Sequence, residues 1–393
     1  MAKNSNLGAA KTAKNDEFYT QYPDIQKEVN AYIEYNPDVF RGKTILLPCD
    51  DPEWSNFTKF FAQNFENFGL KKLISTSYAV ESKKYKVWEP TLFETEAPWD
   101  DEDKSKTHGK IFVLDSDTNG SGRIDIEDLK WEYLEGDGDF RSEEVKKLRD
   151  EADFIITNPP FSLFREFLAW IIESGKQFAI IGNKNCVTYK EVFPLIKDNL
   201  MWSGRTEWAG GLWFETKDST DVDRIVDGVN MKNVSSCWFT NIEHGLRHQP
   251  LQLMTMADNI KFSRHKEVKG IGYQKYDNYD AIEIPYSDAI PSDYDGAMGV
   301  PISFLDKYCP EQYKILGLSQ IDCHPDLPDT KRYNDYKEML NGTDEPTGSS
   351  GGKTNENAVI PGKGNKKTYY LGPNGELAYS EYKRIFIRKK TTK

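Results

Sequence analysis

The stretch EADFIITNPPFSLFREFLAWIIESGKQFAIIGNKN, residues 151–185, decides the fold. Its first apolar run, FIIT, and its last, FAIIGN, are typical of strands, and a turn follows FIIT at Asn158-Pro159-Pro160. Between them SLFREFLAWII has the spacing of an amphipathic helix. A strand, a helix and a strand in this order predict a parallel βαβ unit with a right-handed crossover.

Residues 43–79 repeat this order. KTILLPCDDP at 43–52 predicts a strand, SNFTKFFAQNFENFG at 55–69 a helix, and KKLISTSYA at 71–79 a second strand. Ser55 is expected to cap the start of the helix, and Gly69 stands where a glycine commonly ends one. The two units together predict an α/β fold, in which a mostly parallel sheet carries helices on both faces.

Composition excludes several classes of protein. The chain has 393 residues, of which 38% are hydrophobic and 13% aromatic, enough to bury a large core. The mean hydropathy is -0.69 and no apolar run reaches 18 residues, so no membrane span is expected. Five widely spaced cysteines without a CxxC pair predict neither a disulfide framework nor a zinc finger. No secretory signal is recognised at the start, and a cytoplasmic location is expected.

The net charge of -12 argues against extensive contact with phosphates, which requires Lys and Arg. The basic residues are unevenly placed, however, because residues 353–393 hold ten Lys and Arg against three Glu. Within RIFIRK the alternation predicts a strand, with Ile385 and Ile387 packed inward and the basic side chains projecting to one side. If the partner is a nucleic acid, Arg388, Lys389 and Lys390 are candidates for contact with its phosphates, and a solvated tail without a partner is the alternative.

The tetrad Asn158-Pro159-Pro160-Phe161 at the end of a predicted strand suits methyl transfer to a conjugated amine. Such a nitrogen is a weak nucleophile because its lone pair is delocalised, and two acceptors aimed at its N–H bonds favour the reactive pyramidal form. The Asn158 side-chain oxygen and the Pro159 carbonyl can be those acceptors, while the two prolines hold the backbone rigid. Phe161 can stack on the ring that carries the amine. This catalysis rests on positioning and electrostatic preorganisation.

The tetrad resembles the Asn/Asp-Pro-Pro-aromatic motif of S-adenosylmethionine-dependent amino-methyltransferases. A longer set of segments, spanning roughly residues 15–320, resembles the EcoRI-type adenine-specific DNA methyltransferase family. The resemblance is carried by NDEFYTQY, PCDDPEWSNFTKFFAQNF, GDGDFRSEE, ADFIITNPPFSLFREF, FAIIGNKN, WFTN and YDNYDAIEIPYSDAIPSDYDGAMGVPISFLDKY. It implies a Rossmann-like methyltransferase fold with a target-recognition region, S-adenosylmethionine as cofactor, and double-stranded DNA as partner.

The resemblance also implies roles for particular residues. Asn158, Pro159, Pro160 and Phe161 would be catalytic. The cofactor would be bound by Phe18, Tyr19 and Thr20 near its methionine end, by Pro48, Cys49 and Asp50 in the loop after the first strand, and by Asp139 and Phe140 at its adenine. That loop lacks the glycines usual in such enzymes. The target adenine would have to be flipped out of the duplex to reach the tetrad.

The loop DTNGSGRIDIED matches a calcium-loop template, although its last position is Asp and the residues before it predict a strand. We expect no metal site in the chain, and this loop is the one weak candidate. An acidic loop without metal is the alternative. The candidate ligands are Asp117, Asn119, Ser121, Asp125 and Asp128.

The segments suggest an order of domains along the chain. Residues 1–240 are expected to form the cofactor-binding and catalytic domain, with 81–135 as an insertion, and 241–335 the target-recognition region. Residues 336–370 predict a flexible loop because they are rich in Gly, Ser, Thr and Lys, and 371–393 a basic strand and tail.

The predicted function is site-specific transfer of a methyl group to the N6 amine of adenine in DNA, without an obligatory protein partner. Two alternatives stay open: methylation of an amine in RNA or of a protein glutamine, and a non-catalytic DNA-binding relative.

Overall fold

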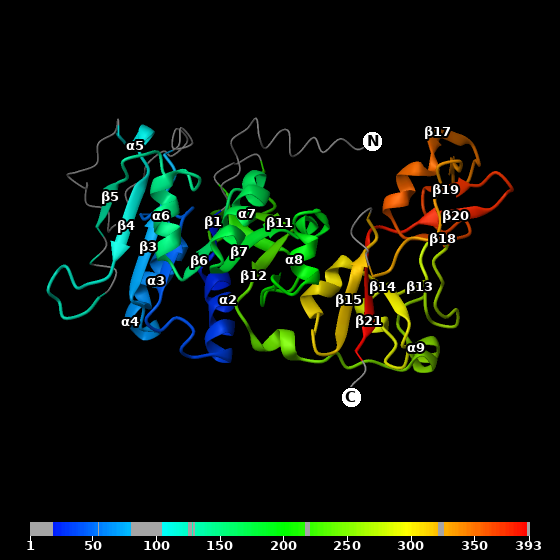
Figure 1. Cartoon of the computed structure of the whole chain (residues 1–393), viewed down its shortest axis with the longest axis horizontal. Helices are drawn as coiled ribbons and strands as arrows, with labels where there is room; N and C mark the ends of the chain where they lie inside the picture. Colours follow the sequence, from blue (N-terminus) through cyan, green and yellow to red (C-terminus); the bar gives the residue numbers. More distant parts are fainter. Residues whose placement is uncertain are drawn as a thin grey trace. The chain divides into compact units, whose positions relative to one another are not determined.

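The computed structural model describes residues 19–53, 55–79, 104–124, 128, 130–216, 221–320 and 326–390 (Figure 1). Contacts divide them into two compact units. The first takes the described residues of Met1–Lys184 and Trp202–Gly245, and the second those of Asn185–Met201 and Leu246–Lys393. No helix among the described residues is long and apolar enough to cross a membrane.

The first unit is built on a sheet that has eight strands in the described part of the chain, in the order β5-β4-β3-β2-β6-β7-β12-β8. Its four central strands are parallel, and each of the outer strands pairs antiparallel. The strands are β2 (Thr44–Leu47), β3 (Lys72–Thr76), β4 (Lys110–Leu114), β5 (Trp131–Tyr133), β6 (Phe154–Thr157), β7 (Gln177–Asn183), β8 (Trp202–Ser203) and β12 (Ser236–Thr240).

The two predicted βαβ units are present, because β2 pairs parallel with β3 and β6 parallel with β7. The expectation of a mostly parallel sheet was wrong, because half of the strands in this sheet run antiparallel to their neighbours. The reason is that an apolar run marks a strand but not its direction. Direction follows from the connection, and only the two helical crossovers were recognisable in the sequence.

Helices cover both faces of this sheet. Side chains of α2 (Tyr22–Tyr35) and α3 (Asn56–Gln63) pack with Ile45 and Phe154, whereas α7 (Phe164–Ser174) lies on the opposite face, where the ring of Phe164 packs at Gly182. The remaining helical segments of this unit are α4 (Phe65–Phe68), α5 (Lys104–Thr107), α6 (Glu143–Glu151) and η3 (Phe161–Leu163).

The ends of the predicted helix 55–69 are confirmed. Ser55 Oγ accepts a hydrogen bond from the Phe57 amide at 3.0 Å, and Gly69 ends the segment with a left-handed φ of 62°. The helix is interrupted at Asn64, whose side chain donates to the carbonyl of Phe60 at 2.8 Å. A short amide side chain competes with helical hydrogen bonding in this way.

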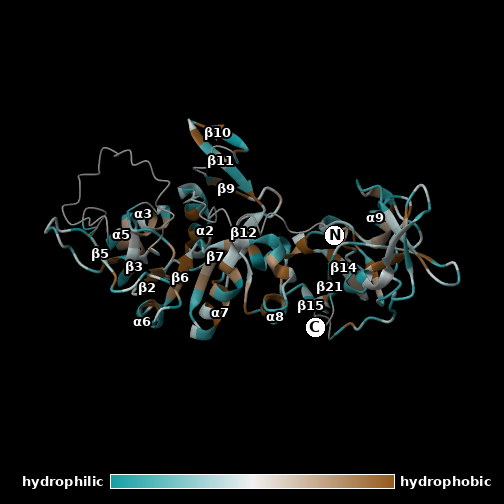
Figure 2. Ribbon diagram, turned by 90° about the horizontal axis from the view of Figure 1, so that it is seen from above, coloured by the Kyte–Doolittle hydropathy of each residue, from teal (hydrophilic) through white to brown (hydrophobic). Residues whose placement is uncertain are grey.

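A second sheet of the first unit has the order β1-β9-β11-β10 in the described residues. Its strands are β1 (Tyr19–Thr20), β9 (Leu212–Glu215), β10 (Arg224–Val226) and β11 (Val229–Val234). Asp227 and Gly228, both at positive φ, form the tight turn that joins β10 to β11. Figure 2 shows that β10 and β11 extend away from the helices of the unit.

The second unit contains two further sheets, in the orders β13-β14-β21-β15 and β17-β16-β19-β20-β18. Their strands are β13 (Ala281–Glu283), β14 (Ala297–Pro301), β15 (Tyr313–Leu318), β16 (Lys337–Leu340), β17 (Pro346–Ser350), β18 (Val359–Pro361), β19 (Thr368–Leu371), β20 (Leu377–Ser380) and β21 (Arg384–Lys389). Its helical segments are α8 (Phe193–Lys197), α9 (Met256–Phe262), η6 (Ser287–Ala289), η7 (Ile302–Lys307) and η8 (Gly351–Glu356). Two short helices, η4 (Lys184–Thr188) and η5 (Gly245–His248), each begin at a residue of the first unit and continue into the second.

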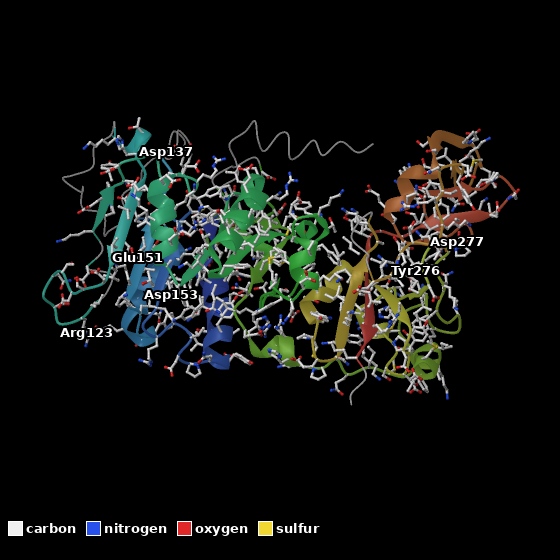
Figure 3. The ribbon with its side chains drawn as sticks, in the orientation of Figure 1. Arg123, Asp137, Glu151, Asp153, Tyr276 and Asp277 are labelled. Carbon is white, nitrogen blue, oxygen red and sulfur yellow. The ribbon has the colours of Figure 1, made fainter. Side chains whose placement is uncertain are left out.

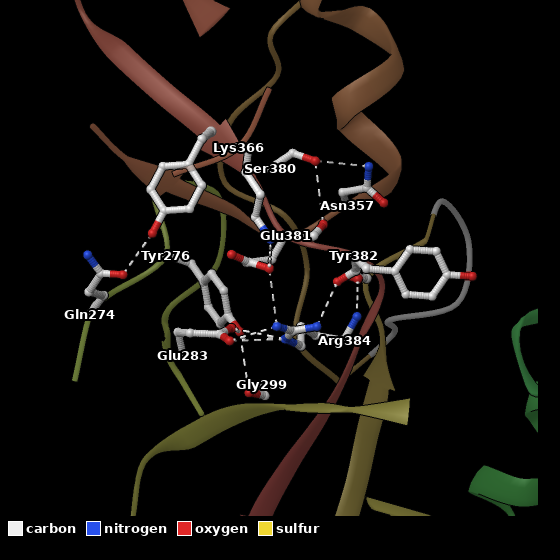
Figure 4. A network of polar contacts seen from close by, with 12 residues as sticks. Gln274, Tyr276, Glu283, Gly299, Asn357, Lys366, Ser380, Glu381, Tyr382 and Arg384 are labelled. Carbon is white, nitrogen blue, oxygen red and sulfur yellow. Dashed lines mark hydrogen bonds and ion pairs between the residues drawn. The ribbon is translucent and has the colours of Figure 1, made fainter. Parts of the chain in front are cut away.

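Two expectations for this unit were wrong. Residues 336–370 do not form a flexible loop; they contribute strands, and Tyr336, just before β16, and Tyr370 on β19 are buried in a small core with Tyr333. Residues 384–389 do form the predicted strand, β21, with Ile385 and Ile387 buried. The expectation that its basic side chains all project outward was wrong, because β21 is an inner strand and Arg384 is buried, where it pairs with Glu283 at 2.8 Å (Figure 4). The high glycine and serine content of residues 336–370 predicted a loop, although their tyrosines pack in a core. The sequence gives no indication that Arg384 pairs with a buried acidic residue.

Candidate active site

The carboxyl ends of the four parallel strands share one edge of the main sheet, where ligands bind in open α/β sheets. The residues that follow these strands are Pro48 after β2, Ser77 after β3, Asn158 after β6 and Lys184 after β7. The candidate catalytic tetrad and the candidate cofactor loop therefore lie at the same edge.

The tetrad follows β6 without a gap. Pro159 is buried, and Asn158 and Phe161 are partly exposed. Pro160 precedes the short helix η3, which begins at Phe161. The Phe161 ring meets that of Phe214 on β9 edge to face, with ring centroids 6.4 Å apart. Phe161 is thereby held by a neighbour that the sequence did not reveal.

The N-terminal motif reaches this site through β9. Thr20 pairs with Phe214 in the antiparallel register of β1 and β9, and its carbonyl accepts a hydrogen bond from Asn56 Nδ2 at 2.8 Å. Thr20 Oγ1 is buried and has no hydrogen-bond partner among the described residues. Tyr19 pairs with Glu215 beside it, and Phe18 lies outside the described residues.

Asp50 occupies the centre of the loop after β2. Its carboxylate accepts hydrogen bonds from the hydroxyls of Ser55 and Thr157, each at 2.6 Å, and its carbonyl accepts one from Ser75 at 2.6 Å. Burial raises the pKa of Asp50 to about 7, against the lowering effect of the two hydroxyl donors. The carboxylate is thus engaged by the protein, which joins the loop to the strand that ends at the tetrad.

The two other residues of this loop have separate surroundings. The Pro48 carbonyl accepts a hydrogen bond from Thr76 Oγ1 at 3.3 Å, which ties the loop to β3. Cys49 is half-buried. Side-chain hydrogen bonds from Thr76 and Ser55 thus hold this loop in place.

The predicted Asp139-Phe140 pair lies in a turn held against the end of β3. Gly138 has φ of 77° and packs so closely that a Cβ there would stand 2.2 Å from the Ser77 carbonyl oxygen. The backbone carbonyl of the preceding residue, Asp137, which is labelled in Figure 3, accepts the Ala79 amide at 2.6 Å. This contact brings the turn to the same edge as the loop after β2.

The side chains of the pair are both engaged. Two nitrogens of Arg141 donate to the Asp139 carboxylate, at 2.6 and 2.9 Å, and these contacts lower the pKa of Asp139. The Phe140 ring is buried against Phe167 and Trp170, with centroids at 5.1 and 5.7 Å.

A buried carboxylate that the sequence did not indicate holds the loop after β8. Both oxygens of Glu28 accept the Arg205 amide at 2.9 Å, and its Oε1 accepts the Tyr32 hydroxyl at 2.7 Å. Burial raises the pKa of Glu28. A Cβ at Gly204 would stand 2.0 Å from Glu28, so this contact requires glycine. Nothing in the neighbourhood of Glu28 along the chain marks it as buried.

The calcium-loop candidates turn their oxygens toward the backbone. Asp128 Oδ1 accepts the amides of Thr118 and Asn119, at 2.8 and 3.0 Å, and Asp117 accepts those of Gly120 and Gly122. Asn119 and Ser121 bond within the same loop, and Asp125 lies outside the described residues. Among the residues that the structure describes, no group of His, Cys, Asp and Glu side chains could hold a metal ion.

The three basic candidates near the C-terminus lie in and after β21. Arg388 is exposed, while Lys389 Nζ donates to the Ser292 carbonyl at 2.6 Å. The Lys390 amide donates to the Gln312 carbonyl at 2.9 Å, so the backbone at Lys390 is held beside the residue that precedes β15.

Comparison with known proteins gives a consistent result. A family model described as "Adenine-specific methyltransferase EcoRI" matches residues 6–390. The chain is 39% identical over 321 residues to the Type II methyltransferase M.EcoRI of Escherichia coli, which covers 80% of this chain and 89% of the relative. It is 33% identical over 321 residues to the Type II methyltransferase M.MpnI of Mycoplasma pneumoniae, covering 80% of this chain and 84% of the relative. No solved structure matches the chain significantly.

Proposed function

The chain belongs to the EcoRI family of adenine-specific methyltransferases, and from that membership we propose that it methylates the N6 amine of adenine within a specific site in DNA. The enzyme class rests on the family, to which nearly the whole chain is matched. The site assignment rests on one structural observation: three motifs that are far apart in the sequence meet at one edge of the sheet.

The convergence has three contacts. Asp50 bonds to Thr157 at 2.6 Å, Thr20 bonds to Asn56 at 2.8 Å, and Phe161 packs on Phe214, the strand partner of Thr20. The first contact joins the loop after β2 to the tetrad. The second joins β1 to the start of α3, and the third joins β1 to the tetrad through β9. A substrate amine at Asn158 and a methyl donor at Thr20 and Pro48 would therefore share one site.

The residues of the tetrad suit the reaction. The Asn158 side-chain oxygen and the Pro159 carbonyl would accept the two N–H bonds of the adenine amine and favour the form that attacks carbon. Phe161 would stack on the base. Holding the amine in line with the methyl group supplies most of the acceleration, since no covalent intermediate with the protein is required.

S-adenosylmethionine is the methyl donor that this proposal requires, and it supplies a methyl group on a positively charged sulfur. The buried hydroxyl of Thr20, which lacks a partner among the described residues, fits a polar group of such a ligand. Backbone groups at Pro48 and Cys49, and the turn at Asp139, lie at the same edge. The carboxylate of Asp50 fits a positioning role better than a contact with the cofactor, because Ser55 and Thr157 already engage both of its oxygens.

We expect the enzyme in the cytoplasm, where its DNA substrate lies. An adenine in a duplex must leave the base stack to reach Asn158. The proposed order of domains keeps catalysis in residues 1–240 and target recognition in 241–335. Nothing in the comparisons favours the alternatives of an RNA, a protein glutamine or a non-catalytic relative.

The test is sequencing, with detection of modified bases, of DNA from cells that express the chain. N6-methyladenine confined to one short sequence is the expected result. Its absence, together with labelled methyl groups in RNA or protein of the same cells, would overturn the proposal.

A further inference from the structure

The segment 256–275 of the second unit is basic in an acidic chain. It contains five Lys or Arg against two acidic residues, whereas the whole chain contains 51 against 63. This local excess has the sign that contact with phosphates requires, and it lies away from the catalytic tetrad in the sequence.

The fold gathers these residues around one backbone contact. Helix α9 ends at Phe262, and the chain then turns back so that the Gly270 amide donates to the Ile260 carbonyl at 2.8 Å. Gly270 and Gly272 have φ of 75° and 91°, which such a reversal needs and other residues rarely adopt. Lys261 and Lys269 each adjoin a residue of that hydrogen bond. The reversal contains the members of what we call the α9 surface: Lys261, Phe262, Lys266, Lys269 and Ile271.

The side chains of the α9 surface are open to solvent. Lys261, Lys266 and Lys269 are exposed, and no acidic side chain in the described part of the chain pairs with them. Phe262 and Ile271 are 59% and 70% exposed, among the most exposed apolar residues described. The nearby acid Asp288 is already occupied, since it pairs with Arg264 at 2.8 Å and with His265 at 2.8 Å.

We infer that the α9 surface binds the sugar-phosphate backbone of duplex DNA, an inference that rests on the proposed function. Three cations without acidic partners can each neutralise a phosphate and release its counterions. The adjoining apolar side chains suit the deoxyribose between phosphates. Contacts of this kind position a duplex without reading its sequence, and they would let an acidic protein hold an acidic substrate.

The test compares two triple variants of the full-length chain. The first is Lys261→Gln, Lys266→Gln and Lys269→Gln. The control, Lys337→Gln, Lys366→Gln and Lys367→Gln, removes the same charge from exposed lysines of the same unit that lie outside residues 241–335. Affinity is measured at several salt concentrations for a duplex that contains the recognition sequence of the enzyme and for a duplex that lacks it.

The first variant should bind both duplexes more weakly, by about 10-fold per lost contact near 0.1 M salt, and its slope of log affinity against log salt should be one to three units shallower. The control should keep the slope of the unmodified protein. Unchanged melting temperatures show that both variants fold.

Equal slopes in the first variant and the unmodified protein would overturn the inference and leave the proposed function intact. Failure of the unmodified protein to bind or methylate DNA would instead refute the proposed function. Vesicles that contain phosphatidylserine test the other anionic partner: binding to them that is lost in the first variant, with an unchanged DNA slope, would assign the surface to a membrane and also overturn the inference.

Discussion

The carboxylate of Asp50 accepts a hydrogen bond from the hydroxyl of Thr157 at 2.6 Å, across 107 positions of sequence. Thr157 is the last residue of β6 and immediately precedes Asn158. Asp50 also accepts from Ser55, which caps α3. One buried carboxyl group therefore connects the loop after the first strand, the following helix and the strand that carries the candidate catalytic residue.

We predict that Thr157→Val slows methyl transfer and that Thr157→Ser largely restores it. Valine keeps the shape but removes the hydroxyl that bonds to Asp50, so the position of Asn158 is less well fixed. A positioning defect should lower kcat more than it raises KM for the methyl donor. Steady-state kinetics of both variants check this. If the valine variant turns over like the unmodified enzyme, the hydrogen bond does not position the tetrad.

The pH dependence of stability should change in Asp50→Asn. Burial raises the pKa of Asp50 from 3.8 to about 7, so the folded protein holds a proton that the unfolded chain releases. The stability from this group is present below pH 4 and is lost as pH rises toward 7. Asparagine mimics the neutral form and does not titrate. Between pH 4 and 7 the unmodified protein should lose stability relative to the variant, by at most about 1.4 kcal/mol per pH unit.

Urea unfolding of the two proteins from pH 4 to 8 measures this difference. Asp137→Asn provides a control at a nearby carboxylate on the same edge. A constant difference in free energy of unfolding across the range would show that Asp50 titrates normally in the folded protein.

The sequence was informative where the chemistry is local. The strand-turn-helix around Asn158 and the caps at Ser55 and Gly69 were predictable, because each depends on residues close together along the chain. The partners Asp50–Thr157, Phe161–Phe214 and Glu28–Arg205 were not, since each joins segments that only the fold brings together. The direction of the outer strands and the buried ion pair of Arg384 could not be predicted for the same reason.

Asn158→Ala should abolish methyl transfer while the affinity for the methyl donor stays within a few-fold. The side chain is assigned to the target amine, and loss of one preorganised contact of this kind commonly costs about 100- to 1000-fold in rate. Asn158→Asp keeps an acceptor oxygen and should retain more activity than the alanine variant. Single-turnover kinetics with calorimetry of the methyl donor separates the two effects. Near-normal turnover in Asn158→Ala would refute the assignment.

Calcium and a chelator should leave the melting temperature and methyl transfer unchanged. The loop 117–124 lies outside the segments of the site, and the oxygens of Asp117 and Asp128 accept backbone amides. A ligand that binds only the folded form would raise the melting temperature with its concentration. A rise with calcium that is lost in Asp117→Asn would show that the loop binds the metal after all.

Replacement of Arg388, Lys389 and Lys390 with Gln tests the remaining basic candidates. If these residues contact phosphates, the variant should bind specific and non-specific DNA more weakly, and each lost contact should flatten the salt dependence by about one unit. The structure distinguishes the three, because Lys389 Nζ donates to the Ser292 carbonyl at 2.6 Å whereas Arg388 is exposed. Lys389→Gln alone should therefore lower stability more than Arg388→Gln, and Arg388→Gln should account for more of any change in slope. Salt titrations and melting temperatures of the single variants and the triple variant decide this, and an unaltered slope in the triple variant means that β21 does not touch DNA.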